Sequence, residues 1–378
     1  MFLRARVFLL GFLCKAHCHS KGLKLFQTFN SSHSHHSLYH PNLHLFNPPM
    51  SSHIYDVLVI GGGPAGLAAG LACARVRRTV LLVDSGEYRN AGIKHMHTVP
   101  SRDHIAPEDF RAAARAQFDR YPHVQFASAK IIDAVQKETA SGFPGFEIRD
   151  ENGEAYVGRK LVLATGSRDV FPAIEGFGEN WPGHIYQCLG CDEFEQRGTP
   201  IGILGFATPE ASHLASMALA FDNRVTVFSN GPVSDAVPIQ AALATVKAQG
   251  VKLDERKTKR LINNGKSHEQ GVSIEFEDGK SVTLGFLVSK PPIVNRAQEL
   301  IEQLGVKTVT REKGGHVEVD GMFNETSVKG CFVAGDTMTP MQQVVVAMAE
   351  RLKAAAGAGM QMIMEESARA VEKKKEKL

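Results

Sequence analysis

The sequence lacks the features that mark nucleic-acid-binding proteins and disulfide-stabilised secreted domains. Its net charge is only +3, and its Lys and Arg residues are not concentrated in one basic region. Because neutralising phosphates requires clustered basic side chains, we expect no nucleic-acid partner. Six cysteines in 378 residues are too few and too unevenly spaced for a disulfide framework. The remaining composition, 43% hydrophobic and 22% charged, is typical of a globular protein. A length of 378 residues predicts two domains, because single cores usually stop growing at about 250–300 residues.

Acidic side chains are absent from Met1 to Tyr55, where basic residues alternate with apolar and Ser/His-rich stretches. The apolar segment from Val7 to Cys14 is far shorter than the roughly 20 residues that span a bilayer, so no membrane helix is expected. Two interpretations stay open for residues 1–50: a secretory or mitochondrial leader, or a non-native extension upstream of a start at Met50. Its cysteines and histidines are irregularly spaced, so we predict no metal site. Unless this segment is a targeting signal, we expect a cytoplasmic protein.

A strand, a glycine turn, a small-residue helix and a second strand follow one another from Ser52 to Arg89. Gly61 permits the tight turn, Gly63 lets the backbone approach a pyrophosphate, and Gly66 allows the helix to pack closely on the strand. Asp84 ends the second strand, where an acidic residue accepts hydrogen bonds from a ribose. The complete βαβ pattern predicts a dinucleotide site with its phosphates on the helix N-terminus.

A second unit with the same order of elements begins at Pro200, but its turn lacks two of the three glycines. Ala207 and Glu210 stand at the second and third glycine positions. A carboxylate at the start of a helix competes with a pyrophosphate for the same N-terminus. The segment after the second strand, 229–231, has neither a ribose-binding acid nor an arginine for a 2′-phosphate. We therefore do not expect NADPH binding, although atypical binding through backbone amides stays open.

Between these units, Cys188-Leu189-Gly190-Cys191 forms a CxxC pair. Such a pair can form a disulfide, and one thiolate is stabilised by its neighbour. No second CxxC or paired histidines follow at zinc-ribbon spacing, so zinc is not predicted. Asp192 can relay the proton that a thiol gains or loses, with a solvated helix cap as the alternative. Glu193 and Glu195 are interpreted as surface charges.

From about Asp56 to Met362 the chain resembles the pyridine-nucleotide disulfide oxidoreductases of thioredoxin-reductase type. The motifs that carry the resemblance are VIGGGPAG at Val59 to Gly66, VLATGS at Val162 to Ser167, CLGCD at Cys188 to Asp192 and GCFVAGDT at Gly330 to Thr337. The resemblance implies the α/β class, with two Rossmann-like (three-layer ββα) domains, the second inserted in a discontinuous FAD domain.

The expected domains follow from that resemblance and from the proline-marked crossing at Pro291 and Pro292. The Ala- and Met-rich segment from Met341 to Met364 is interpreted as a buried helix. The predicted ranges are 1–50 for the leader or extension, 51–170 plus 294–365 for the FAD-binding domain, 171–293 for a degenerate NAD(P)-binding-like domain carrying CxxC, and 366–378 for a charged tail.

Within this family, the chain is more similar to the fungal gliotoxin-type dithiol oxidases. The segments that suggest this are DSGEYRN at Asp84 to Asn90, KHMH at Lys94 to His97, SRDH at Ser101 to His104 and GDTMTP at Gly335 to Pro340. The resemblance implies that a small-molecule dithiol reduces the cysteine disulfide, FAD accepts the electrons, and O2 reoxidises FAD with release of H2O2, in fungal secondary metabolism. Those oxidases tend to carry His after the second cysteine, where this chain has Asp192.

The resemblance also implies roles for individual residues. Cys188 would exchange with the substrate sulfur, Cys191 would face the flavin, and Asp192 would move the proton. The implied FAD-binding residues are Gly61, Gly62, Gly63, Pro64, Ala65, Gly66, Asp84, Ser85, Arg89, Asn90, His97, Ala164, Thr165, Gly166, Gly335, Asp336, Gln343 and Val344. A homodimer is implied as well. The alternatives are an NADPH-dependent thioredoxin or disulfide reductase and a non-enzymatic flavin-binding redox sensor.

Overall fold

The computed structural model describes residues 53–190, 192–310 and 315–377. The predicted leader, its histidines and Cys191 lie outside the described residues. Within them, the first βαβ unit forms a mostly parallel sheet in the order β3–β2–β1–β6–β5–β4, with β17 paired to the C-terminal part of β6. Its strands are β1 (Ile54–Ile60), β2 (Val80–Asp84), β3 (Val124–Ser128), β4 (Ile131–Glu138), β5 (Pro144–Asp150), β6 (Ala155–Leu163) and β17 (Cys331–Val333).

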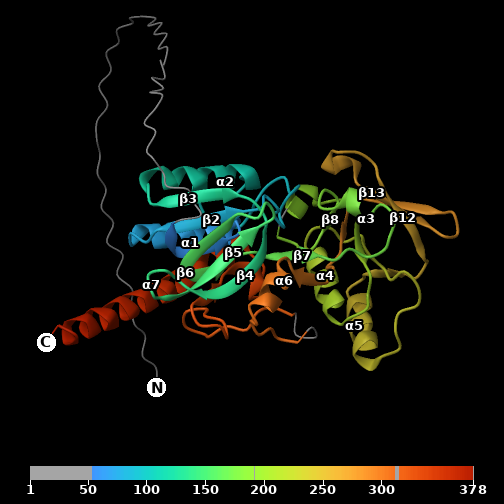
Figure 1. Cartoon of the computed structure of the whole chain (residues 1–378). Helices are drawn as coiled ribbons and strands as arrows, with labels where there is room; N and C mark the ends of the chain where they lie inside the picture. Colours follow the sequence, from blue (N-terminus) through green and yellow to red (C-terminus); the bar gives the residue numbers. More distant parts are fainter. Residues whose placement is uncertain (1–52, 191, 311–314, 378) are drawn as a thin grey trace, which may run out of the picture. The chain divides into compact units, whose positions relative to one another are not determined.

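Alternate side chains of the central strands enter two separate apolar layers, as the two-residue period of a strand requires. Val57 and Val59 pack with the helices α1 and α7, whereas Leu58 and Ile60 pack with the antiparallel strands β4 and β5 and with α6. Figure 1 shows these elements, with α7 in red extending to the C-terminus. The helices are α1 (Pro64–Arg75), α2 (Pro107–Ala116) with η2 (Gln117–Arg120), α6 (Gln298–Gln303) and α7 (Val344–Lys375).

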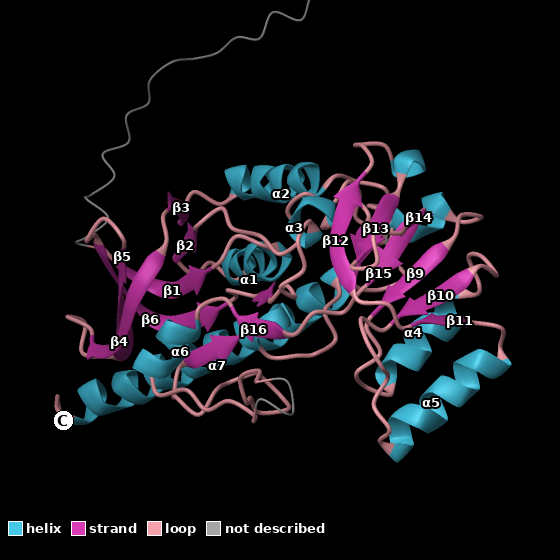
Figure 2. Cartoon of the chain, turned by 90° about the vertical axis from the view of Figure 1, so that its right-hand side faces the viewer, coloured by secondary structure: helices cyan, strands magenta, loops and turns pink. Residues whose placement is uncertain are grey.

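The second βαβ unit repeats this arrangement of layers. Its parallel sheet has the order β11–β10–β9–β15–β8. Ile203 and Val227 pack against α4 and α5 on one face, while Phe228 and Leu287 pack against the antiparallel strands β12 to β14 on the other (Figure 2). The elements are β8 (Ile185–Tyr186), β9 (Ile201–Leu204), α4 (Glu210–Ala218), β10 (Val225–Phe228), α5 (Val237–Ala248), β11 (Lys252–Asp254), β12 (Thr258–Asn263), β13 (Val272–Phe276), β14 (Ser281–Leu284) and β15 (Phe286–Val288). Both units thus have three layers, which confirms the predicted fold class.

The chain passes between the two units through a short antiparallel ladder of β7 (Ser167–Asp169) and β16 (Ile293–Asn295). The predicted boundary 170/171 lies just after β7, and 293/294 lies between the first two residues of β16, so the domain ranges stay a prediction. The remaining short elements are α3 (Phe177–Asn180), η3 (Asp192–Gln196), η4 (His268–Gln270) and η6 (Gly335–Thr337).

Two expectations about exposure are wrong. Helix α7 buries only one face, through residues such as Ala354 and Met362, while Leu352 and Ile363 are 63% and 58% exposed. Glu193 is 0% exposed, so its charge did not predict a surface position. No helix in the described part of the chain is both long enough and apolar enough to cross a bilayer.

Candidate functional site

A cavity of about 800 Å³ lies at the C-terminal ends of β1, β2 and β6. That volume is within the roughly 300–1,000 Å³ of ligand pockets, and the C-terminal edge of a parallel sheet is where such folds bind ligands. Every residue implied to bind FAD lines this cavity except Gly66. Gly66 packs beneath the turn, where a Cβ would lie 1.8 Å from the carbonyl oxygen of Gly61. A side chain at position 66 would clash with the turn, whereas residues 61 to 65 line the cavity.

The turn before α1 leaves the helix N-terminus open to the cavity. Gly61 adopts a φ of +113°, which side chains disfavour. Gly63 is the N-cap residue of α1, no side chain caps the helix there, and Pro64 follows. A Cβ on Gly63 would meet no atom within 4 Å. The first amides of α1 are therefore free to bind an anion such as a pyrophosphate.

Asp84, at the end of β2, is held by three donors. Its Oδ2 accepts hydrogen bonds from the Tyr88 hydroxyl and the Arg115 guanidinium, both at 2.5 Å, and its Oδ1 accepts from the Gly86 amide at 3.1 Å. A carboxylate has about four acceptor positions, so one is left for a ribose hydroxyl. Burial and the bond to Asp84 raise the pKa of Tyr88, which keeps its hydroxyl protonated as a donor.

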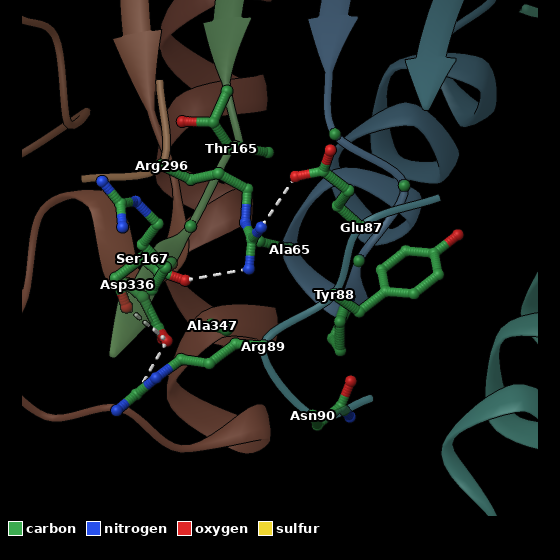
Figure 3. Close-up of a pocket in the computed structure, with 18 of the residues that line it drawn as sticks. Ala65, Glu87, Tyr88, Arg89, Asn90, Thr165, Ser167, Arg296, Asp336 and Ala347 are labelled. Carbon is green, nitrogen blue, oxygen red and sulfur yellow. Dashed lines mark hydrogen bonds and ion pairs between the residues drawn. The ribbon is translucent and has the colours of Figure 1, made fainter. Parts of the chain in front are cut away.

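Arg89 connects the cavity wall with the dithiol loop. It forms a bidentate ion pair with Asp169 at 2.7 and 3.0 Å, contacts Asp336 at 3.3 Å and also donates to Gln187, next to Cys188. Burial lowers the pKa of Arg89, but these carboxylates outweigh it and the net pKa is raised. Burial also raises the pKa of Asp336, and Arg89 opposes that rise. Figure 3 shows Arg89 directed at Asp336.

Arg296 was not predicted from the sequence, although it lines the same cavity. Its guanidinium contacts Glu87 at 2.9 Å and the Ser167 carbonyl at 3.5 Å, and its amide donates to the Gly166 carbonyl (Figure 3). Arg296 follows β16, so the segment that returns from the second unit to the first supplies part of the cavity wall. The prolines that mark this segment in the sequence were the signal that could have pointed to Arg296.

The dithiol loop reaches the cavity. Cys188, which is half-buried, and Gly190 both line it. Asp192 begins η3 with only 3% of its surface exposed, which excludes the alternative of a solvated cap. Buried Cys73 and Cys331 lie elsewhere, and burial raises the pKa of each thiol to about 12, so they are inert as nucleophiles.

Asp192 contacts a histidine that the sequence placed only near the flavin. His97 Nε2 lies 3.0 Å from Asp192 Oδ1, and His95 Nδ1 lies 3.5 Å from the same oxygen. Both rings thus lie against one buried carboxylate oxygen beside the dithiol loop, where a carboxylic acid and an imidazole can exchange a proton.

The turn of the second unit is arranged differently. Glu210, the first residue of α4, accepts hydrogen bonds from the Thr208 hydroxyl and from its own backbone amide. These bonds lower the pKa of Glu210, with a smaller contribution from Lys290, so it carries a negative charge at neutral pH. The negative charge thus lies on the first turn of α4, the end of the helix at which a nucleotide-binding unit would bind a pyrophosphate.

Residues 55–350 match the pyridine nucleotide-disulphide oxidoreductase family. The chain belongs to this family. It is 40% identical over 301 residues to thioredoxin reductase tcpT of Claviceps purpurea, covering 78% of this chain and 90% of that protein. It is 34% identical over 320 residues to thioredoxin reductase sirT of Leptosphaeria maculans, with 82% and 95% covered. The crystal structure of an oxidoreductase from Agrobacterium tumefaciens superposes with a TM-score of 0.73 at 29% identity, covering 82% of this chain and 99% of that one.

Membership of this family implies FAD as the cofactor. The cavity fits that group: the open side of Gly63 can receive the pyrophosphate, Asp84 a ribose hydroxyl, and Asp336 the ribityl chain. The protein is an FAD-dependent disulfide oxidoreductase.

Proposed function

We propose that this oxidoreductase is a dithiol oxidase, which converts a small-molecule dithiol to a disulfide and passes the electrons to O2 with release of H2O2. The observation that carries the proposal is the Glu210 carboxylate on the first turn of α4. A negative charge there repels the pyrophosphate of NADPH. Electrons then have to enter from the thiol side. A role in fungal secondary metabolism belongs to the same proposal.

The chemistry begins at the half-buried Cys188, which lines the cavity wall. A substrate thiolate attacks Cys188 and breaks its bond to Cys191, so Cys191 leaves as a thiolate. The second substrate sulfur then attacks the mixed disulfide, which releases the product disulfide and the Cys188 thiol. Asp192 takes up the proton that the substrate thiol loses.

Bound FAD supplies the two-electron acceptor, through which the pair from the reduced cysteines reaches O2. Arg89 keeps the loop at the cavity through Gln187, and its pairing with Asp336 fixes the opposite wall. The residues of this chain thus position the sulfurs and hold the protons. The proposed partners are the dithiol and O2, and a homodimer remains a prediction.

The second candidate is an NADPH-dependent disulfide reductase, which the names of tcpT and sirT favour. Oxygen uptake and peroxide production separate the two candidates. Purified holoprotein is given dithiothreitol or NADPH in air, alongside the variants Cys188→Ser and Cys191→Ser and the control Cys73→Ala, whose thiol lies outside the cavity.

The proposal expects oxygen uptake with dithiothreitol, one peroxide for each disulfide formed, and at most background uptake with NADPH. Both serine variants should lose the uptake, and Cys73→Ala should keep it. NADPH-supported reduction of a disulfide, with no dithiol-driven uptake by the wild type, would make the protein a reductase.

A further inference from the structure

Two histidines approach the buried carboxylate of Asp192 and a third packs against them; all three come from the loop between β2 and α2. His97 lies against Asp192, His95 approaches the same oxygen, and the His104 ring centroid is 4.6 Å from that of His97. This cluster, His95, His97 and His104, was not recognised as a unit in the sequence. It lies beside the dithiol loop, and two of its members line the cavity.

Side-chain exposure rises along the path from Asp192 through His97 to Asp103. Side-chain exposure is 5% for Asp192, 10% for His97 and 59% for Asp103. The connecting atoms lie 3.0 Å apart from Asp192 to His97 and 3.7 Å apart from His97 Nδ1 to Asp103.

Beyond Asp103, the path continues on the surface. Asp103 lies 3.4 Å from His104 Nδ1, and His104 Nε2 lies 3.3 Å from Glu195 of η3. The Thr98 amide, as the main cause, lowers the pKa of Asp103, which therefore remains an ionised acceptor. His97 thus faces Asp192 from η3, and His95, Asp103 and His104 from its own loop, while Glu195 faces His104.

The proposed reaction needs such a path. A dithiol that closes to a disulfide gives up two protons and two electrons. Cys188 retains one proton in the reduced enzyme when Cys191 stays a thiolate. The other proton has to be held by a nearby group or exchanged with solvent until the formation of H2O2 takes up two protons. Asp192 is 3% exposed and has no direct access to bulk water. An imidazole can accept a proton at one ring nitrogen and donate from the other, so a histidine beside a carboxylic acid is suited to receive its proton and pass it on.

We propose that His97 relays the proton between Asp192 and solvent, by way of Asp103 and His104. His97 acts through Asp192 and not on a sulfur, so it is a positioning and relay residue. The proposal rests on the dithiol oxidase function. The oxidases that this chain resembles tend to carry a histidine directly after the second cysteine; here Asp192 stands at that position, and a histidine contacts it.

The test measures the rate at which a dithiol bleaches the flavin in anaerobic holoprotein, across pH 6 to 9. The variants are His97→Asn, which keeps a hydrogen-bonding side chain but cannot titrate, and His97→Ala with and without added imidazole. His213→Asn is the matched control, because His213 is an exposed histidine of α4 away from the cluster. Flavin content is measured for each protein to show that it folds and binds FAD.

We expect His97→Asn to bleach about 100-fold more slowly, the low end of general acid–base effects, with a flattened pH profile. Imidazole should accelerate His97→Ala in proportion to its concentration, and His213→Asn should match the wild type. Equal rates and pH profiles for His97→Asn and the wild type would overturn the relay. So would a slow His97→Ala that imidazole does not rescue.

The wild type separates this proposal from the function on which it rests. If a dithiol bleaches the wild type and His97→Asn alike, the relay fails and the oxidase stands. If only NADPH bleaches the wild type, the oxidase fails, and the relay is then measured on NADPH-driven disulfide reduction, where the same proton moves inward. Equal rates of the two proteins in that reaction would overturn the relay there as well.

Discussion

The two βαβ units of this chain share a fold but differ at the first turn of one helix. In the first unit, Gly63 leaves the N-terminus of α1 open to a cavity. In the second, the Glu210 carboxylate accepts hydrogen bonds at the N-terminus of α4. Both units have the layer arrangement that permits nucleotide binding, and the comparison predicts that the charge at the helix start decides which of them binds phosphate.

Placing a carboxylate in the first unit should have the largest effect. Gly63→Glu puts a negative charge at α1 in open space, and like-charge repulsion costs several kcal/mol. We expect FAD affinity to fall by at least about 100-fold, so the purified protein should be colourless. The measurement is flavin absorbance per protein after desalting. Gly63→Ala is the control and should retain flavin; a yellow, folded Gly63→Glu protein would refute the assigned phosphate position.

Removing the ribose acceptor should have the next largest effect. Asp84→Asn keeps the size of the side chain but removes the charge that Arg115 and Tyr88 contact. Hydrogen bonds to charged groups contribute about 1.5–3 kcal/mol, so FAD affinity should fall roughly 10- to 100-fold. Titration of apoprotein with FAD measures the change. Unchanged affinity in a folded Asp84→Asn variant would mean that the ribose lies elsewhere.

Removing the carboxylate from the second unit should have a smaller, opposite effect. Glu210→Ala frees the first amides of α4, and helix-end charge interactions are worth up to about 2 kcal/mol. We expect NADPH affinity to rise up to about 30-fold, as measured by calorimetry. Glu277→Ala removes an exposed glutamate elsewhere in this unit and should leave NADPH affinity unchanged. A wild type that already binds NADPH as tightly as Glu210→Ala would contradict the comparison.

The smallest effect concerns the ion pairs that α7 forms with the first unit. Glu366 bonds to Arg78 and Arg159, and Arg78 is the main cause that lowers its pKa below the ordinary 4.5. A lowered folded pKa stabilises the protein above pH 4.5, and that contribution is lost as the pH falls through the folded pKa. Glu366→Gln should therefore lower the Tm slightly at pH 7 and show a weaker loss on acidification. Glu372→Gln, exposed on the same helix, is the thermal-melt control; equal acid sensitivity of all three proteins would count against these ion pairs.

The fold and the cavity were predictable because their signals are local. The glycine turn, the acid that ends β2 and the CxxC pair each depend on neighbours within a few residues, and their chemistry constrains the backbone directly. The degenerate turn was equally readable, since Glu210 interacts with its own amide and with Thr208.

The proton path was not predictable, because it depends on contacts between distant parts of the chain. His97 and Asp192 are separated by 95 positions, and Arg89 and Asp336 by 247. No periodicity or residue spacing in the sequence predicts a contact between residues so far apart. The prediction of side-chain exposure failed for a related reason, because tertiary packing and not residue type decides burial. Glu193 is charged but buried, and α7 is rich in apolar residues but buries only one face.

The most direct test of the central claim is an anaerobic titration of the flavin in the wild-type protein, first with NADPH and then with dithiothreitol, followed by absorbance. The account predicts that NADPH leaves the flavin oxidised and that dithiothreitol bleaches it fully. Rapid bleaching by NADPH would contradict it, because the Glu210 carboxylate would then have failed to exclude the nucleotide.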